Sequence, residues 1–593
     1  MNTNPSLALA LALSFTLAAC GGGGGADRQA TTPATDGGSQ SPGGNQPPSQ
    51  EVPAPPPAVP APPAPPSEPE DPAPAPGVPP APPPVTPPAP PPVEPPVPPA
   101  PQAPGIAPRP EVAYGVKAFT FIWDVVPTAT YYRIGSSPIP DSGQSGGVSV
   151  VVDKIAATTL QVDDIDLTAK IGGLFMQNYL VQACNDIGCG PWSASVQAAP
   201  NRAVGYFKPA ELPGAERFGS AVAVSGDGKT IAIGSPEFSE ATGRVTVYTN
   251  RDGNGWKLSF TGSVVQPAKG DRLGSSVALS RDGNTLAVGM PGAGQQGVVL
   301  VYRYANESWW TFRSVTATRA TSEAGSSVAL SADGQILAFG APGEYYNAGA
   351  AYVADLSLGS GVLPTRLYRT VETTGVRYGE RIDLSDDGKT VVVGTARDGG
   401  GASYAQVFRG ESLYWQSTNI LQNPNSLMPF GFVPSVAVSG DGSRVAIGDL
   451  RTVSLFLRMP AGNYVPTTVR SNQDYEGGAL AFSSDGKRLL FGISNGRTRG
   501  EGVWASAETD PTVTSRPGGV EILDEMTDHT WSSKKLIAAT NPADGDSFGA
   551  AVAISADGKT IVVGAPNEAS NAVGINGNQA DNSRPSAGAA YLY

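Results

Sequence analysis

An internal repeat in the C-terminal two thirds of the chain constrains the fold most. Within a recurring apolar pattern, Asp-Gly pairs begin at Asp227, Asp282, Asp333, Asp387, Asp441, Asp485 and Asp557. Successive pairs lie 44 to 72 residues apart. Such a period is typical of proteins built from stacked supersecondary units, in which no unit can bury its apolar face alone.

Each copy predicts four short strands, with a tight turn between the first two. Copy one, residues 218–236, places two Ala/Val/Ile-rich segments around Asp227-Gly228, and copy seven repeats this over residues 548–566. Asp-Gly suits a hairpin turn because Gly adopts positive φ at low cost. Strands that are apolar at nearly every position must be covered on both faces. Seven such units predict an all-β structure with a seven-bladed β-propeller over residues 201–593.

The ends of the repeat region predict how the ring closes. Residues 589–593 match only the third strand of a copy. In the repeat region a fourth strand stands shortly before the start of each later copy. Residues 203–210 stand at the same place before Phe218, so we expect them to pair with the last unit as its missing fourth strand. An open solenoid built from the same repeats is the alternative.

The repeats resemble the FG-GAP repeats of integrin α-subunit propellers. Copy one starts with Phe218-Gly219 and reaches Gly-Ser-Pro at 234–236, and copy seven starts with Phe548-Gly549 and reaches Gly-Ala-Pro at 564–566. The match is good in copies one, two, three and seven, weaker in copy four and poor in copies five and six. The resemblance implies a propeller fold, although proteins that share this fold differ in function.

Integrin repeats of this kind often carry a calcium loop with acidic residues at alternate positions. The equivalent loop in copy one, residues 225–230, offers only the carboxylate of Asp227 beside Lys229, and copy four adds Asp386. Calcium requires six to eight oxygen ligands. We therefore expect a hairpin turn with a Ser/Asp cap, no cofactor and no metal residues, with calcium binding as the alternative.

Residues 111–200 predict a separate β-sandwich, because short alternating apolar segments such as 119–123 are set apart by turn residues. The segment resembles fibronectin type III domains. Trp123 stands where that family keeps its core tryptophan, and Leu167 followed by Tyr179 is similar to its tyrosine corner. The resemblance implies a spacer or an adhesive module.

The chain has three cysteines and one histidine, which limits its chemistry. Cys184 and Cys189 flank a predicted hairpin, and we expect a disulfide between them in an oxidising compartment, with two free thiols as the alternative. These few ligands cannot form an ordinary zinc site. A nucleophilic mechanism would have to use His529, and no nucleophile-elbow pattern accompanies it. We therefore expect no enzyme activity, with a polysaccharide-acting enzyme that uses paired carboxylates as the alternative.

Residues 1–19 predict a signal peptide, since the apolar run at 7–19 is too short to span a bilayer. Leu-Ala-Ala-Cys at 17–20 resembles a bacterial lipobox, which implies acylation of Cys20 and stable membrane attachment. Gly21 after the cysteine resembles the pattern of lipoproteins sorted to the outer membrane, so we expect display at the cell surface or on its periplasmic face. An ordinary signal peptide with a chance cysteine is the alternative, because residues 1–6 lack Lys and Arg.

Residues 20–110 predict a disordered linker. Gly and Ser dominate up to about residue 50, and 31 prolines follow between 51 and 110. Proline-rich chains extend by about 3.1 Å per residue, so this part could reach well over 100 Å. It would act as a stalk for the folded domains.

These observations together predict a membrane-displayed binding or adhesion protein. The partner would be a protein or a glycan, while a net charge of −13 disfavours nucleic acid. We expect a monomer. The longest interval between copies, 505–546 with the adjacent Trp504, contains His529 and Trp531, and predicts either the functional loop or a disordered excursion. A periplasmic envelope-assembly scaffold is the alternative function.

Overall fold

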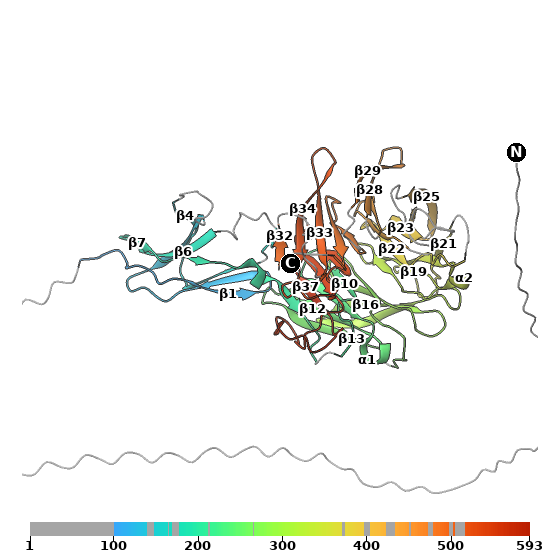
Figure 1. The fold of residues 1–593 in the computed structure, drawn as a ribbon, viewed down its shortest axis with the longest axis horizontal. Coiled ribbons are helices and arrows are strands. Elements are labelled where there is room, and N and C mark those ends of the chain that lie inside the picture. The colour runs from blue at the N-terminus through green and yellow to red at the C-terminus, as the bar shows by residue number, and fades with distance from the viewer. Residues whose placement is uncertain are drawn as a thin grey trace, which may run out of the picture. The chain divides into compact units, whose positions relative to one another are not determined.

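The computed structural model describes residues 100–138, 147–163, 165–168, 177–211, 214–264, 266–369, 374–395, 404–422, 433–449, 452–471, 478–496, 502–504 and 516–593. The predicted signal peptide, Cys20 and nearly all of the linker lie outside these ranges. Strands dominate the described structure (Figure 1), beside the short helices η3 (Pro200–Ala203), α1 (Phe238–Ala241) and α2 (Glu344–Asn347). None of the helices described is long and apolar enough to cross a membrane.

The first strand begins at Glu111, and residues 111–197 form two antiparallel sheets. One sheet contains β1 (Glu111–Gly115), β2 (Ala118–Ile122) and β5 (Thr159–Val162). The other contains β4 (Ser149–Ile155), β3 (Tyr131–Pro138), β6 (Gln177–Asn185), β7 (Gly188–Trp192) and β8 (Val196–Gln197). Trp123 and Tyr179 are both buried in one shared core, where the Trp123 ring packs edge-on against Tyr132 with centroids 5.5 Å apart.

Residues 205–593 form consecutive antiparallel sheets, consistent with a β-propeller. Sheet one contains β10 (Ala221–Val224), β11 (Thr230–Ser235), β12 (Arg244–Thr249) and β13 (Lys257–Gly262). Sheet two contains β14 (Ser276–Leu279), β15 (Thr285–Met290), β16 (Val298–Ala305) and β17 (Ser308–Val315). Sheet three contains β18 (Val328–Leu330), β19 (Ile336–Ala341), β20 (Ala350–Asp355) and β21 (Thr365–Leu367).

The later sheets keep the same order. Sheet four contains β22 (Arg381–Leu384), β23 (Thr390–Thr395), β24 (Tyr404–Glu411) and β25 (Tyr414–Gln422). Sheet five contains β26 (Ser435–Val438), β27 (Arg444–Gly448), β28 (Thr452–Arg458) and β29 (Tyr464–Ser471). Sheet six contains β30 (Leu480–Phe482), β31 (Arg488–Ile493), β33 (Gly519–Glu525), β34 (Trp531–Ala538) and β32 (Gly502–Trp504). Sheet seven contains β35 (Ala551–Ile554), β36 (Ile561–Ala565), β37 (Ala589–Leu592) and β9 (Gly205–Phe207).

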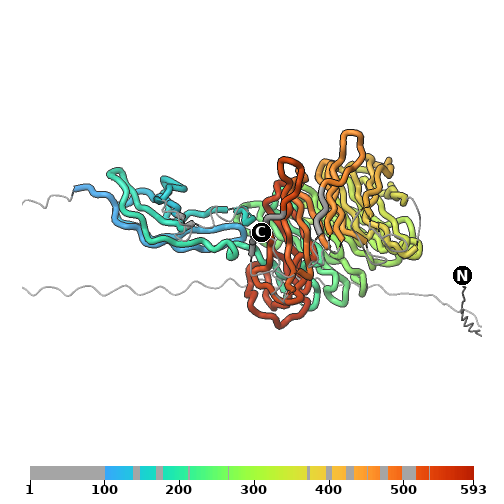
Figure 2. Tube along the Cα trace, turned by 45° about the horizontal axis from the view of Figure 1, so that its top comes forward, coloured from blue at the N-terminus to red at the C-terminus, as the bar shows by residue number. Residues whose placement is uncertain are grey.

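The N-terminal strand of the repeat region completes sheet seven, which confirms the pairing predicted for residues 203–210. β9 pairs antiparallel with β37, placing Tyr206 opposite Tyr591. Figure 2 shows the red C-terminal segment against the green segment that begins the repeats. Beyond β9, Lys208 forms a buried ion pair with Glu568, with Nζ and Oε2 2.6 Å apart. The two ends of the repeat region are therefore held in one sheet.

The glycines of the Phe-Gly and Gly-Ala-Pro motifs meet between neighbouring sheets. A Cβ on Gly564 would overlap the carbonyl oxygen of Gly219. The same overlap occurs between four further pairs, namely Gly234 with Gly274, Gly289 with Gly325, Gly340 with Gly379, and Gly492 with Gly549. Only glycine permits so close a backbone approach. The repeated motif is thus a packing contact between sheets.

The Asp-Gly turns are linked by backbone hydrogen bonds that run through all the sheets and return to the first. Each N–H donates to a carbonyl of the next turn at 2.8 to 3.2 Å. The bonds run Gly226 to Arg281, Arg281 to Ala332, Ala332 to Asp386, Asp387 to Gly440, Gly440 to Ser484, Ser484 to Ala556, and Ala556 to Gly226. This closed series fixes the inner strands around a common axis.

Candidate functional site

The strand order gives the ring two ends. We call the end with the Asp-Gly turns and the turns between third and fourth strands the Asp-Gly end. The opposite end, which carries the loops between second and third strands and the Phe-Gly turns, is the Phe-Gly end. Binding residues of rigid scaffolds usually lie on such loops, so each end is a candidate surface.

The aspartates of the Asp-Gly turns are occupied by their own turns. Asp227 Oδ1 accepts hydrogen bonds from the Ser225 hydroxyl at 2.5 Å and from the Lys229 N–H at 3.0 Å. The other six copies repeat the hydroxyl bond at 2.5 to 2.7 Å. The predicted Ser/Asp cap is therefore confirmed. Across the described residues, no three His, Cys, Asp or Glu side chains are grouped so that they could share a metal ion.

Three side chains cross the axis at the Asp-Gly end. Arg281 of sheet two lies 2.7 Å from a carboxylate oxygen of Asp386 in sheet four, and both contact the Ser484 hydroxyl of sheet six. A side chain at Gly226 would collide with Arg281, and one at Gly440 would collide with Asp386. The two glycines therefore leave room for the crossing, which obstructs the axis at this end.

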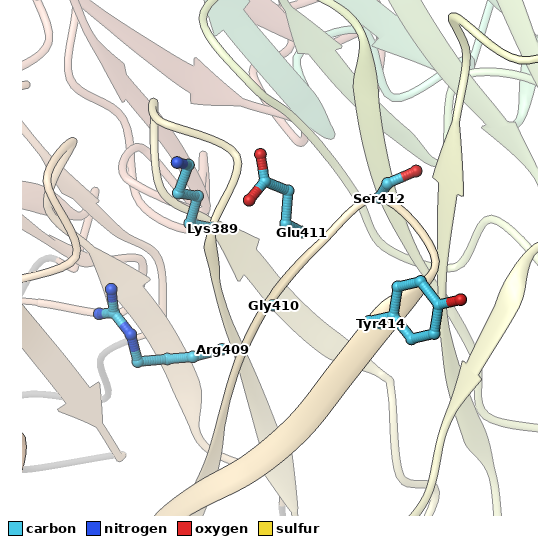
Figure 3. A pocket seen from close by; sticks show the side chains of 6 residues that line it. All are labelled: Lys389, Arg409, Gly410, Glu411, Ser412 and Tyr414. Atoms are coloured by element: carbon cyan, nitrogen blue, oxygen red, sulfur yellow. The ribbon is translucent and has the colours of Figure 1, made fainter.

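A hollow of about 740 Å³ lies at the Asp-Gly end of sheet four. Lys389 and Glu411 contribute charged groups to it, and Tyr414 is 85% exposed at its rim. Figure 3 shows the Arg409 and Tyr414 side chains extending to opposite sides, away from the end groups of Lys389 and Glu411. These side chains therefore do not converge on one point of the hollow.

Two loops at the Phe-Gly end contain consecutive residues in the left-handed region. Tyr345, Tyr346 and Asn347 of α2 have φ of 54°, 55° and 63°. Ser239, Glu240 and Ala241 of α1 adopt the same conformation in sheet one. Left-handed residues other than glycine cost about 1 to 2 kcal/mol each. The surrounding sheet must hold these turns in place.

A hollow of about 800 Å³ lies beside the α2 turn. The side chains of Tyr345 and Tyr346 border it and are 49% and 86% exposed. The Arg319 guanidinium lies 4.7 Å from the centroid of the Tyr345 ring. Beneath the turn, Glu344 is fully buried and accepts hydrogen bonds from Tyr352 and Arg366. The buried ion pair of Glu344 and Arg366 thus fixes the turn that carries the exposed Tyr345 and Tyr346.

A second hollow of about 350 Å³ lies among the Phe-Gly turns of sheets two to four and shares Glu323 with the first. Arg377 is held between Glu323 and Glu380, at N–O distances of 2.9 and 2.7 Å. Arg272 and Arg381 also line this hollow. It therefore brings three guanidinium groups to one surface.

The interval 505–546, predicted to be either a functional loop or a disordered excursion, contains two regular strands in the part that the structure describes. Residues 505–515 lie outside the described ranges, but β33 and β34 are the regular third and fourth strands of sheet six. Trp504 ends the added strand β32, and Trp531 packs against Phe482 with ring centroids 6.0 Å apart. His529 lies in the exposed hairpin turn, 3.0 Å from Glu525. The interval is thus lengthened by the added strand β32, while His529 and Trp531 belong to the β33–β34 hairpin of sheet six.

The two cysteines predicted to form a disulfide lie in the sandwich of residues 111–197. Cys184 of β6 stands opposite Cys189 of β7, and a disulfide joins them. Cys20 lies outside the described residues. Sequence reasoning missed Tyr345 and Tyr346, although adjacent tyrosines directly after Gly-Ala-Pro-Gly-Glu at 340–344 were a visible signal.

Comparisons with known proteins support the repeat assignment over a short stretch. A family model described as FG-GAP repeat matches residues 531–593, which span the strands β34, β35, β36 and β37. No curated protein matches the chain. The chain is similar in structure to hydrazine synthase of Kuenenia stuttgartiensis, with 17% identity, a TM-score of 0.40, and coverage of 63% of this chain and 98% of that chain. A chain of a mitotic checkpoint complex shows 14% identity, a TM-score of 0.39, and coverage of 60% and 87%.

Proposed function

We propose that this chain is a membrane-displayed binding protein that uses a seven-bladed FG-GAP β-propeller as its ligand platform. The single observation that carries the proposal is the closed series of hydrogen-bonded turns, which holds loops from different sheets in one fixed surface. A rigid scaffold with loops at one end is a common design for recognition. The Phe-Gly end is the favoured face, because the axis is obstructed at the other.

The remainder of the chain would serve display. Residues 1–19 would be removed on export, Cys20 would carry the lipid, and residues 20–110 would act as the stalk. The sandwich of residues 111–200 would be a fibronectin type III-like spacer, and the packing of Trp123 and Tyr179 in its core supports that reading. A lipid anchor with more than one acyl chain would retain the protein on the outer membrane.

Protease shaving of intact cells, with immunodetection of the propeller, tests the display. Loss of the signal from intact cells is expected, and host proteins and glycans would then be screened as ligands. Survival of the signal until the cells are permeabilised would contradict surface display and favour a periplasmic assembly scaffold. A Cys20→Ser variant controls for the anchor, since it should be released into the soluble fraction.

A further inference from the structure

The two hollows of the Phe-Gly end form one polar surface, since both are lined by Glu323. Apart from the tyrosine rings, Ala320 and Pro291 are the only apolar side chains among their described lining residues. Protein partners usually anchor through an apolar or aromatic side chain in a desolvated pocket. This surface offers hydroxyl, amide and charged groups, which suit a hydroxyl-rich ligand better.

Two of the arginines at this surface retain free hydrogen-bond donors. Arg377 is balanced by its two glutamate partners, whereas the nearest carboxylate to Arg272 is Glu237 at 3.6 Å. Arg381 forms no ion pair within the described residues, and one of its nitrogens donates to the Glu380 carbonyl at 3.3 Å. A guanidinium presents paired donors that match a carboxylate or a sulfate group. The surface therefore favours an anionic group on its ligand.

The tyrosine pair distinguishes this turn from its counterpart in sheet one. Both turns share the left-handed backbone, so that conformation belongs to the fold. Sheet one carries Ser, Glu and Ala at the three positions, whereas sheet three carries Tyr345, Tyr346 and Asn347. Exposed aromatic faces pack well against the C–H face of a sugar ring, and the Asn347 amide lies beside them in the same lining.

We infer that the Phe-Gly end binds an acidic carbohydrate. Arg272 and Arg381 would hold its carboxylate or sulfate group, and Tyr345 and Tyr346 would stack on a neighbouring sugar ring. The inference rests on the proposed function, because it names the ligand class of that same platform.

Calorimetric titration of the full-length protein tests the inference with three probes. These are an oligogalacturonate, whose charges are all carboxylates, a carrageenan oligosaccharide, whose charges are all sulfates, and a neutral cello-oligosaccharide. The variants are Arg272→Ala/Arg381→Ala, Tyr345→Ala/Tyr346→Ala and, as a matched control from the hollow at the other end, Lys389→Ala/Tyr414→Ala. The single variant Tyr346→Ala replaces the tyrosine pair if that variant does not fold, because its side chain is the more exposed one.

At least one acidic probe should bind, and more weakly as salt is raised. The arginine variant should lose about tenfold or more in affinity, since hydrogen bonds to charged groups contribute that much. The tyrosine variant should lose about threefold to tenfold, and the control should keep its affinity. Equal binding of the neutral probe, or loss of binding in the control variant, would overturn the inference but leave the platform function intact. Absence of binding to all three probes, with the propeller shown to be on the cell surface, would also overturn only the inference.

Discussion

At the scale of single residues, the Phe-Gly and Gly-Ala-Pro motifs are halves of one contact. The glycine of one motif meets the carbonyl of the glycine from the other motif in the next sheet, which explains why both positions repeat. Where the motif is missing, the contact changes. Gly394 of sheet four faces the Pro434 carbonyl instead. Between sheets four and five the Pro434 carbonyl thus takes the place of the glycine carbonyl, whereas copy six keeps the glycine contact through Gly492 and Gly549.

Gly564→Ala should destabilise the protein, because the new methyl group would overlap the Gly219 carbonyl at the interface between sheets seven and one. Overpacking of this kind costs about 1 to 3 kcal/mol in the free energy of unfolding. Gly359→Ala is the matched control, since no atom lies within 4 Å of the added Cβ. Urea unfolding of both variants measures the difference, and equal midpoints would refute the packing role of the glycine pair.

Asp546 should make stability depend on pH. Burial raises the pKa of Asp546 to about 7, and the nearby Glu568 adds to the rise, whereas an unfolded aspartate titrates near pH 4. Between these values the folded protein binds a proton that the unfolded chain does not. The free energy of unfolding should therefore fall as the pH rises from about 4 to about 7.

Asp546→Asn should make that decline shallower by about 2 to 4 kcal/mol, because the uncharged side chain has nothing to titrate. It still offers an oxygen to the Ala543 N–H, which Asp546 accepts at 2.9 Å. Asp186→Asn is the control, since that side chain is exposed in the turn between β6 and β7 of the sandwich. Urea unfolding at a series of pH values measures the slope. An unchanged slope in Asp546→Asn would contradict the assignment, while Asp383, whose pKa burial also raises to about 7, would leave a residual decline.

At the scale of elements, the closing strand β9 depends on a buried ion pair as well as on its ladder. Lys208 and Glu568 are almost fully buried, and Lys208 also donates to the Gly588 carbonyl at 2.9 Å. Asn541 and the Ser570 N–H donate to the other Glu568 oxygen. These bonds join the chain before copy one to the loop between β36 and β37. The pair thus adds a side-chain link between β9 and the segment that leads into β37.

Lys208→Met should cost about 3 to 5 kcal/mol in the free energy of unfolding, because it leaves the Glu568 carboxylate buried without its counter-ion. The double variant Lys208→Met/Glu568→Gln should lose less, since no buried charge remains while the amide can still accept from Asn541. Chemical unfolding of both variants distinguishes them. If the double variant is as unstable as the single one, the loss of stability comes from the packing of the Lys208 side chain and not from an unpaired charge on Glu568.

Strands were predictable from the sequence because apolar alternation and Asp-Gly turns are local signals. Residues 203–210 were also predictable, since they stand where a fourth strand is expected. The insertion in copy six was misread, because a three-residue strand such as β32 gives no periodicity to detect. The arginine surface was not predictable. Arg272 and Arg381 are 109 positions apart in the chain, and only the stacking of sheets two to four brings them to one hollow.

At the scale of the whole molecule, a closed ring and an open array respond differently to loss of an end. Removing residues 589–593 takes away β37, the strand with which β9 pairs, and leaves β9 only the bridge from Phe207 to Ile575. In a closed ring, hydrogen exchange should then rise in β10 and β11 of sheet one as well as in sheet seven, because the interface between these sheets is lost. An increase confined to sheet seven would instead indicate an open array. Hydrogen exchange with mass spectrometry measures both regions.

The pairing of β9 with β37 also sets the order of events during biogenesis. β9 is among the first parts of the repeat region to be synthesised, and β37 is the last. The ring therefore cannot close until residues 589–592 have left the ribosome and, for an exported chain, crossed the membrane. Until then the apolar faces of the first and last sheets stay uncovered, which makes the unfinished chain a natural client for chaperones. A premature stop codon before residue 589 would leave that exposed state permanent.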